Sequence, residues 1–321
     1  MCLGRAAGIA AGYLADLAFG DPRRGHPVAG FGLAAAGLER VTYADDRRAG
    51  ALHTTALLGL LAATGAAGER AAARRGPVWL AALTALTTFV GLGGTSLTRT
   101  GTRMADLLSA DRIEDARRLL PSLCGRDPST LDPDGLIRAS VESVAENTSD
   151  AQVAPLMWAA VGGVPAILVY RGANTLDAMI GHRSPRYERF GWAAARFDDV
   201  LNMAAARLTG LMVAFCAPLV GGSPTSAVRA WCRDAARHPS PNAGVAEASF
   251  AGALNVRLGG PTQYAHRLEI RPTLGDGSAP QIDDLRRAVR LSQAVQFVSA
   301  TLATVAVTAV CRSGRRASPR W

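Results

Sequence analysis

The chain has 321 residues, of which 49% are hydrophobic and 19% are charged, and its formal net charge is +9. All 35 basic residues are Arg, which excludes a phosphate-loop lysine and a Schiff-base lysine but supplies many bidentate binders of phosphate and carboxylate. The Arg residues are spread over every loop with few aromatic residues beside them, so we expect no nucleic-acid partner.

Apolar residues are gathered in long uncharged windows. Each window is close to the roughly 20 residues that a helix needs to cross a bilayer, and they cover residues 51–68, 77–98, 151–170, 208–228 and 291–310. A shorter window, residues 6–20, is interrupted only by Asp16 and predicts a retained first span rather than a cleaved signal. The predicted fold class is therefore mainly α: a polytopic integral membrane protein with four to six apolar helices and helical cytoplasmic loops, forming a single domain over residues 1–321.

The first span is followed by GDPRRGHPVAGFG, residues 20–32. Its two X-Pro steps and its glycines predict a fixed, non-helical turn at the membrane surface. Asp16, Asp21 and His26 could form a polar cluster at the mouth of a site, or the turn could be a charged loop that anchors the end of a span.

Residues 99–203 form a polar region that carries most of the motifs. Asp132 followed by Pro133 predicts the start of a helix, and along that helix Glu142, Glu146 and Asp150 are four residues apart. Like charges at this spacing disfavour an isolated helix by about 0.2 to 0.5 kcal/mol per pair, which suggests a bound cation or an Arg partner. A solvated helix face is the alternative.

The apolar window 151–170 is interrupted by Pro and Gly, at Pro155, Gly162, Gly163 and Pro165. Such breaks are tolerated at membrane depth where the backbone is buried in protein or lines a cavity, so the segment is either a broken helix at a binding site or a kinked span. The distribution of Arg favours a topology in which neither 151–170 nor 208–228 crosses and every polar motif faces the cytoplasm. If 151–170 does cross, Glu146 and Asp177 lie on opposite sides of the membrane.

A second soluble region covers residues 223–290 and contains SPNAGVAEASFAGALNVRLGGPTQY. Its Gly and Pro residues predict a specific loop that approaches a ligand with its backbone. Asn242 lies in this loop.

Four motifs carry a family resemblance: GDPRRGHPV; VAENTSDAQVAPLMWAAVGGVPAILVYRGANTLDAMIG; RYERFGWAAARFDDVLN; and SPNAG followed by FAGALNVRLGG. Together, and in this order, they resemble the adenosylcobinamide-phosphate synthase family of cobalamin biosynthesis (CobD/CbiB family). The resemblance implies a multi-pass cell-membrane ligase, and the distribution of Arg predicts that its active site faces the cytoplasm. It implies that the enzyme joins (R)-1-aminopropan-2-ol or its O-phosphate to the carboxylate of adenosylcobyric acid by an amide bond. ATP and Mg²⁺, a corrinoid substrate, the lipid bilayer and other late enzymes of cobalamin assembly are the implied cofactors and partners.

An amide ligase that uses ATP through an acyl phosphate needs acidic residues for Mg²⁺, cations for the phosphoryl group and a base for the ammonium proton. The predicted catalytic residues are Glu142, Glu146, Asp150 and Asp177. The predicted substrate-binding residues are His26, Asn147, Arg171, Asn174, Arg183, Arg186, Tyr187 and Asn242. The predicted metal ligands are Glu146, Asp150, Asp198 and Asp199.

Two other classes of function remain open at this point. Asp198, Asp199 and Asn202 weakly resemble the acidic clusters with which membrane prenyltransferases hold Mg²⁺ and a diphosphate. A transporter is the alternative that is not an enzyme, supported by the broken segment and by Asp16 within an apolar window. No inverted repeat is visible in the sequence, and the polar motifs cluster in loops.

Overall fold

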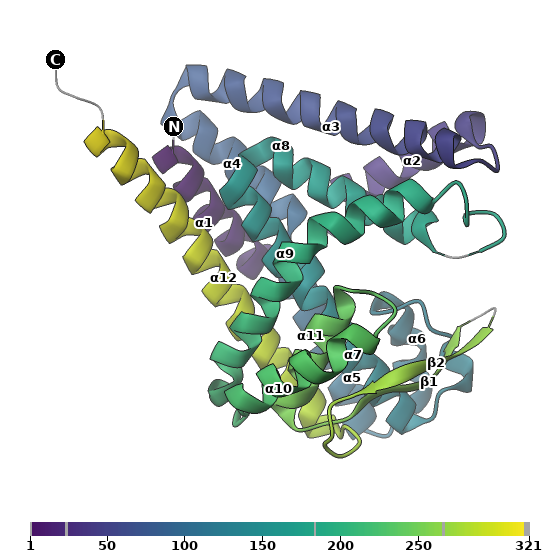
Figure 1. Ribbon diagram of the computed structural model, residues 1–321. Coiled ribbons are helices and arrows are strands. Elements are labelled where there is room, and N and C mark those ends of the chain that lie inside the picture. Colours follow the sequence, from purple (N-terminus) through teal and green to yellow (C-terminus); the bar gives the residue numbers. More distant parts are fainter. Residues whose placement is uncertain (1, 23–24, 183, 265–266, 318–321) are drawn as a thin grey trace. The chain divides into compact units, whose positions relative to one another are not determined.

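A computed structural model describes residues 2–22, 25–182, 184–264 and 267–317 (Figure 1). The chain divides into two compact units. The first unit takes its described residues from 1–93, 154–202 and 299–321, and the second takes its residues from 94–153 and 203–298.

The first unit is helical. Its elements are α1 (Cys2–Phe19), α2 (Pro27–Thr42), α3 (Arg47–Arg75), α4 (Pro77–Gly91), α8 (Ala154–Leu176) and the first part of α9 (Trp192–Cys216). In it α1 packs along α4, and α3 packs along α8 (Figure 1). The end of the long last helix, α12 (Ile282–Ala317), also belongs to this unit.

Three glycines one turn apart allow α1 to approach α4 closely. A Cβ built on Gly4 would come within 2.7 Å of the Pro77 carbonyl oxygen, and one on Gly8 would come within 2.5 Å of Thr84 Cβ. Gly12 meets the next turn of α4 in the same way, with Thr88 Cβ at 2.6 Å from its virtual Cβ. Small residues at four-residue spacing are a common means of packing helices in membranes, where apolar burial alone does not drive association.

The break predicted within 151–170 is present in α8. Gly163 has φ 65° and ψ −147°, a conformation that only glycine adopts readily, and Pro165 follows it. The backbone N–H of Val164, freed by this break, donates to Glu69 Oε2 of α3 at 2.9 Å. Glu69 also forms an ion pair with Arg5 of α1. The break is therefore stabilised by a carboxylate from another helix, as a helix N-cap would be.

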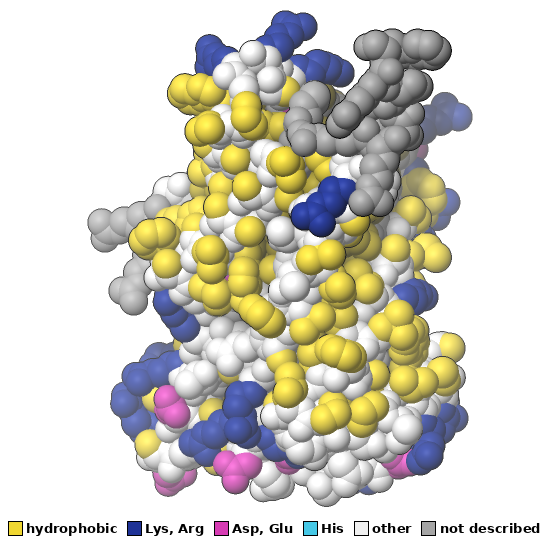
Figure 2. Space-filling view, turned by 90° about the vertical axis from the view of Figure 1, so that its left-hand side faces the viewer, with side chains coloured by type: hydrophobic (Ala, Val, Ile, Leu, Met, Phe, Trp, Pro, Cys, Tyr) yellow, Lys and Arg dark blue, Asp and Glu magenta, His cyan; other side chains and the backbone are white. Residues whose placement is uncertain are grey.

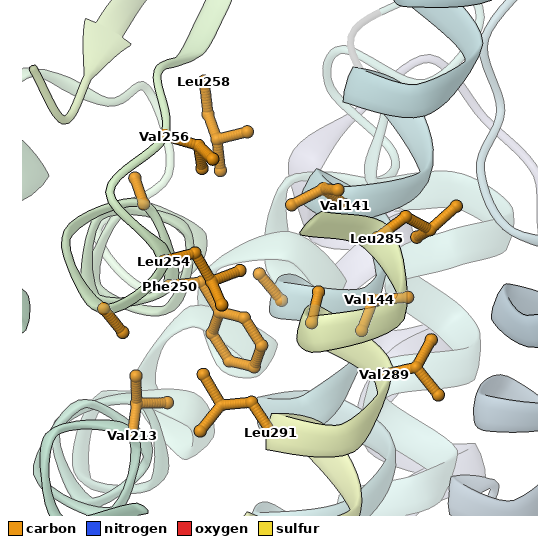
Figure 3. Packing of buried hydrophobic residues seen from close by; sticks show 14 of the residues in the cluster. Val141, Val144, Val213, Phe250, Leu254, Val256, Leu258, Leu285, Val289 and Leu291 are labelled. Atoms are coloured by element: carbon orange, nitrogen blue, oxygen red, sulfur yellow. The ribbon is translucent and has the colours of Figure 1, made fainter. Parts of the chain in front are cut away.

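The second unit contains shorter elements. They are α5 (Gly94–Ser109), α6 (Ile113–Leu119), α7 (Pro133–Thr148), the remainder of α9, α10 (Pro224–Asp234), α11 (Ala243–Leu254), β1 (Leu258–Tyr264), β2 (Arg267–Leu274) and the start of α12. The two strands pair antiparallel with an irregularity between Leu258 and Gly260. Figure 3 shows the core of this unit, where Phe250 and Leu254 of α11 lie among side chains of α7, α9 and α12 such as Val141, Val213 and Leu291.

The start of α7 was predicted correctly. Asp132 caps the helix by accepting from Gly135 N at 2.7 Å, and Pro133 occupies the first turn. At the other end, a π-helical turn over Ser149–Val153 leads to Ala154, where the chain passes from the second unit to the first. The residues VAENTSD therefore belong to the second unit, and the chain returns to the first unit at Ala154.

Five helical segments are long and apolar enough to cross a membrane. They are Arg47–Arg75, Pro77–Ser109, Pro133–Gly181, Trp192–Val220 and Ile282–Ser313. Large hydrophobic side chains such as Leu33, Phe215 and Val310 are exposed, and Figure 2 shows hydrophobic side chains over a broad area of the face that it displays. These features confirm the predicted class, a polytopic helical membrane protein.

Two predicted boundaries were wrong. The window 208–228 is not one helix, because α9 ends at Cys216, a short 3-10 turn follows, and Pro224 begins α10 after a left-handed Gly221. The helix instead begins at Trp192, so that Asp198 and Asn202 lie inside α9 and not in a loop before it. Residues 240–264 are not a loop throughout, since most of them form α11 and β1; Ser240, Pro241 and Asn242 before α11, and the three residues 255–257 between α11 and β1, lie outside these elements.

Candidate functional site

A buried cluster of carboxylates and guanidinium groups lies in the second unit. Glu142 of α7 is 1% exposed, and it forms an ion pair with Arg126, which is also buried. The other oxygen of Glu142 accepts from the backbone N–H of Gly259 at 2.7 Å. Burial alone would lower the pKa of Arg126, but the Glu142 carboxylate raises it above its ordinary value. Both carboxylate oxygens of Glu142 therefore have protein partners, and the side chain stabilises the fold.

Glu247 of α11 is the second buried carboxylate. Its Oε1 lies 3.7 Å from His238 Nε2 and 3.6 Å from Arg271 Nη1, yet neither carboxylate oxygen receives a hydrogen bond from a described residue. Burial, and after it the charges of Glu142 and Glu146, hold the pKa of Glu247 well above its ordinary value. Burial of this kind favours the neutral, protonated form of the carboxyl group and is typical of groups that take part in proton transfer.

Glu146 lies one turn beyond Glu142 on α7 and is partly exposed. The charged groups that act on it are Arg271, Arg126 and Glu142. No described residue donates a hydrogen bond to its carboxylate. Two glutamates were predicted to be catalytic. Both carboxylate oxygens of Glu142 have protein partners, whereas the carboxylate of Glu146 accepts no hydrogen bond from a described residue and could contact a substrate.

The SPNAG motif, residues 240–244, forms a turn beside this cluster, and hydrogen bonds hold this turn in place. Ser240 N donates to His238 Nδ1 at 3.1 Å, and Ser240 Oγ accepts from Ala243 N at 3.1 Å. Asn242 Oδ1 accepts from Arg207 Nη1 at 2.8 Å. Gly244 leaves room for His238, because a Cβ there would come within 2.5 Å of His238 Cβ.

A pocket of about 440 Å³ opens beside this turn. Arg207, Trp231 and His238 are among the residues that line it. Since His238 also lies 3.7 Å from Glu247, its ring separates the pocket from the buried carboxylate. This volume lies within the range of small-molecule sites, which is about 300 to 1,000 Å³.

The predicted substrate residues Arg186 and Tyr187 lie in the first unit, where they meet at Glu39. Arg186 Nη2 donates to Glu39 Oε1 at 2.8 Å, and Tyr187 Oη donates to the same oxygen at 3.1 Å. The Arg186 guanidinium also lies over the ring of Tyr43, 4.1 Å from its centroid. Glu39 is buried and was not predicted. It holds the loop after α8 against α2.

Other predicted residues of the first unit form separate local contacts. Asp198 accepts from Asn202 Nδ2 at 2.9 Å, and Asn202 accepts from Tyr170 Oη at 2.9 Å. Asp199 lies 3.5 Å from Arg196. These hydrogen bonds hold Asp198 and Asn202 in a chain of side chains between α8 and α9.

The remaining predicted residues divide between the units. His26 caps α2 by accepting from Val28 N, with Asp21 at 3.7 Å. Arg171 donates to Asn174 at 3.2 Å, and Asp177 lies in the π-helical turn Asp177–Gly181 that follows α8. In the second unit, Asn147 donates to the Ser143 carbonyl at 2.9 Å and Asp150 lies in the turn after α7. Arg183 lies outside the described residues.

Within the described ranges, no three His, Cys, Asp or Glu side chains are grouped so that they could hold a metal ion. Glu146 and Asp150 belong to the second unit, whereas Asp198 and Asp199 belong to the first. The assignment of these four residues as metal ligands stays a prediction.

Three members of the buried cluster were missed from the sequence: Arg126, Glu247 and Arg271. Arg126 and Arg271 lie outside the motifs that were singled out. Glu247 lies between SPNAG and FAGALNVRLGG, in a helix that is buried on every side. A charged residue within an otherwise apolar helix was the signal that could have identified it.

The fold and the cluster define a polytopic helical membrane protein with a buried site of carboxylates and arginines, of the kind that suits proton transfer and anion binding. Residues 9–292 match the family described as CobD/Cbib protein, and the chain belongs to this family.

Relatives named "Cobalamin biosynthesis protein CobD" extend over most of the chain. The one from Mycobacterium tuberculosis (strain ATCC 25618 / H37Rv) is 63% identical over 303 residues, which cover 94% of this chain and 96% of that protein. The one from Geobacter metallireducens is 40% identical over 300 residues, covering 92% of this chain and 94% of that protein. No solved structure matches the chain significantly.

Proposed function

We propose that this member of the CobD family is the synthase that joins (R)-1-aminopropan-2-ol, or its O-phosphate, to the carboxylate of adenosylcobyric acid. The observation that carries the proposal is the buried cluster of the second unit, in which Glu146 is free of hydrogen bonds from described residues beside two arginines. Family membership supplies the pathway, and the cluster supplies groups that suit the reaction.

In this proposal Glu146 acts as the base. An amine attacks an acyl group only as the free amine, so the substrate ammonium gives its proton to the Glu146 carboxylate, which becomes a carboxylic acid. The positive charge of Arg271 acts on Glu146, and in this proposal Arg271 stabilises the negative charge that develops on the acyl group. Glu142 and Arg126 fix the position of α7 and are not consumed in the reaction.

ATP and Mg²⁺ form a further part of the proposal. A carboxylate is a poor acyl donor, and its conversion to an acyl phosphate by ATP, with release of ADP, would supply the activation that attack by an amine requires; the attack would then expel inorganic phosphate. This part rests on the chemistry of amide formation. The pocket lined by Arg207, Trp231 and His238 shares His238 with the surroundings of Glu247, and we assign it to one of the substrates.

The test is amide formation by the full-length protein in lipid nanodiscs, with adenosylcobyric acid, ATP, Mg²⁺ and either form of the amine. Glu146→Gln keeps the shape of the side chain and removes the base, so we expect turnover to fall by about 100-fold or more. Glu114→Gln is the control, because Glu114 belongs to the same unit and its side chain is 71% exposed. Undiminished turnover in Glu146→Gln would remove Glu146 from the mechanism.

Complementation separates this function from transport. A cell that lacks the amidation step should regain cobinamide synthesis with this chain, whereas a transporter would restore corrinoid uptake only. The proposed cytoplasmic orientation of the site has its own test. In Asp134→Cys, at an exposed position near the start of α7, the new thiol should resist an impermeant maleimide in intact cells and react in inverted vesicles.

A further inference from the structure

Two motifs that are far apart in the sequence meet at one cavity of the first unit. The cavity has a volume of about 140 Å³. Pro27 and Val28 of the GDPRRGHPV motif line it, together with Arg171, Gly172 and Thr175 of the YRGANT segment. A cavity of this size holds a small chemical group rather than a whole corrinoid.

The helices around the cavity are packed tightly. A Cβ on Gly172 would come within 2.4 Å of Leu61 Cδ1 and 3.0 Å of Leu58 Cδ2. The glycine therefore lets α8 approach α3 and brings the neighbouring Arg171 side chain to the cavity wall. The remaining wall is mostly apolar and includes Phe31 and Ile167.

Arg171 is the charged residue of the cavity lining. Its Nη1 donates to Asn174 Oδ1 at 3.2 Å, whereas its Nε is buried and has no hydrogen-bond partner among the described residues. No Asp or Glu of the described part of the chain forms an ion pair with it.

The two threonines of the wall do not compete for a ligand as donors. Thr87 Oγ1 donates to the Leu83 carbonyl at 3.0 Å, and Thr175 Oγ1 donates to the Arg171 carbonyl at 2.7 Å. Arg171 is thus the group that would donate to a ligand in the cavity. Its helix lies in the apolar segment Pro133–Gly181, where an arginine without a counter-charge is costly and commonly marks a functional site.

We infer that this cavity is an anion site, in which Arg171 binds the phosphate group of a small substrate. The low dielectric of the apolar wall strengthens the pairing of a guanidinium with a phosphate, and the planar guanidinium can bind two phosphate oxygens at once. The inference rests on the proposed function, where the amine that is joined to the corrinoid can carry a phosphate. It concerns the binding of that phosphate in the first unit and not the deprotonation of the amine at Glu146, which belongs to the second unit. The phosphate of a lipid headgroup has the same chemistry, and the experiment separates the two sources.

The first experiment uses calorimetry to measure the binding of aminopropanol O-phosphate to the full-length protein in phosphatidylcholine nanodiscs. Arg171→Gln should weaken binding by about tenfold or more, the loss expected for a charge-assisted hydrogen bond. Aminopropanol without the phosphate should bind the variant and the unchanged protein equally. The control is Arg196→Gln, because Arg196 lies in the same unit with a side chain that is 64% exposed.

The second measurement is thermal unfolding, which also shows whether the variant is folded. Removal of an unpaired charge from an apolar segment should leave the unfolding temperature of the free protein unchanged or raise it. Aminopropanol O-phosphate should raise that temperature for the unchanged protein and for Arg196→Gln, and not for Arg171→Gln. Arg171→Lys keeps the charge without the planar fork and should retain part of the effect.

The outcomes distinguish this inference from the proposed function. If amide formation proceeds and Arg171→Gln binds the phosphorylated amine as tightly as the unchanged protein does, the inference is overturned while the function stands. If the variant instead loses phosphatidylglycerol that is retained by the unchanged protein in native mass spectrometry, with phosphate-ester binding intact, the ligand is a lipid and the inference is again overturned. If no amide forms but Arg171-dependent binding is present, the proposed function fails and the anion site stands.

Discussion

Replacement of Glu142 by Ala should destabilise the second unit severely. The side chain of Glu142 is 2% exposed, and that of its partner Arg126 is 6% exposed. Truncation leaves the Arg126 guanidinium buried without its carboxylate, and it leaves the N–H of Gly259 without its acceptor, which lies at 2.7 Å. Both groups lose their partners at once.

The size of the effect follows from these two losses. Removal of one partner of a buried ion pair costs about 3 to 5 kcal/mol, and an unsatisfied backbone N–H costs about 1 to 3 kcal/mol. The two terms share one side chain and do not add fully, so we expect about 4 to 6 kcal/mol. This is a large part of the total stability of a typical domain, which is about 5 to 15 kcal/mol.

A double substitution separates the stranded charge from the loss of packing. In Arg126→Met/Glu142→Leu both charges are absent, so the variant should be more stable than Glu142→Ala by about 3 to 5 kcal/mol, the cost of the stranded charge. Glu142→Gln should fall between them, since its amide oxygen can still accept from Gly259. The assay is denaturant unfolding in detergent micelles, with hydrogen exchange of the peptide that contains Gly259 as the local probe. Unfolding of Glu142→Ala at the same denaturant concentration as the unchanged protein would refute the reasoning.

Three further predictions concern other parts of the chain. Gly8→Leu should lower stability by about 1 to 3 kcal/mol or more through overpacking against α4, measured by thermal unfolding with Gly37→Leu as the control, since nothing lies within 4 Å of a Cβ built there. Glu69→Ala should cost about 1 to 3 kcal/mol, because the N–H of Val164 loses its acceptor at the helix break, whereas Glu69→Gln, which keeps an acceptor, should cost less. Because the raised pKa of Glu247 means that the folded state binds a proton more tightly than the unfolded state, stability should fall as pH rises from the ordinary range of Glu toward that raised pKa. Glu247→Gln should flatten this dependence in unfolding measured at several pH values, and an unchanged pH dependence would contradict the assignment.

The sequence predicted the class of the fold because its signals are local. Uncharged windows of span length identify membrane helices without knowledge of their partners, and the Asp132–Pro133 start of α7 depends only on the chemistry of one turn. The break at Gly163 was expected for the same reason. The hydrogen bond from Val164 N to Glu69 at this break was not expected, since Glu69 lies 95 residues away in sequence.

The candidate site was predicted in part. Acidic residues at four-residue spacing on α7 led to Glu142 and Glu146, and the expected Arg partner exists as Arg126. Spacing along one helix could not show that Glu247 approaches from α11, nor which carboxylate would be engaged, because both depend on contacts between residues distant in sequence. The error at 208–228 has a different cause. The turn between α9 and α10 is itself uncharged, so the uncharged window continued through it and hid the end of α9.

The three glutamates of the cluster show how one residue type takes different roles through its contacts. Glu142 gives both oxygens to fixed partners and so can only hold structure. Glu247 is buried among charges of both signs and holds its proton more tightly than an ordinary carboxyl group. Glu146 is partly exposed and accepts no hydrogen bond from a described residue. A base must exchange its proton with a substrate that enters and leaves, and of the three only Glu146 combines access with free oxygens. Its substitution by Gln should therefore affect turnover more than stability, and that of Glu142 should affect stability first.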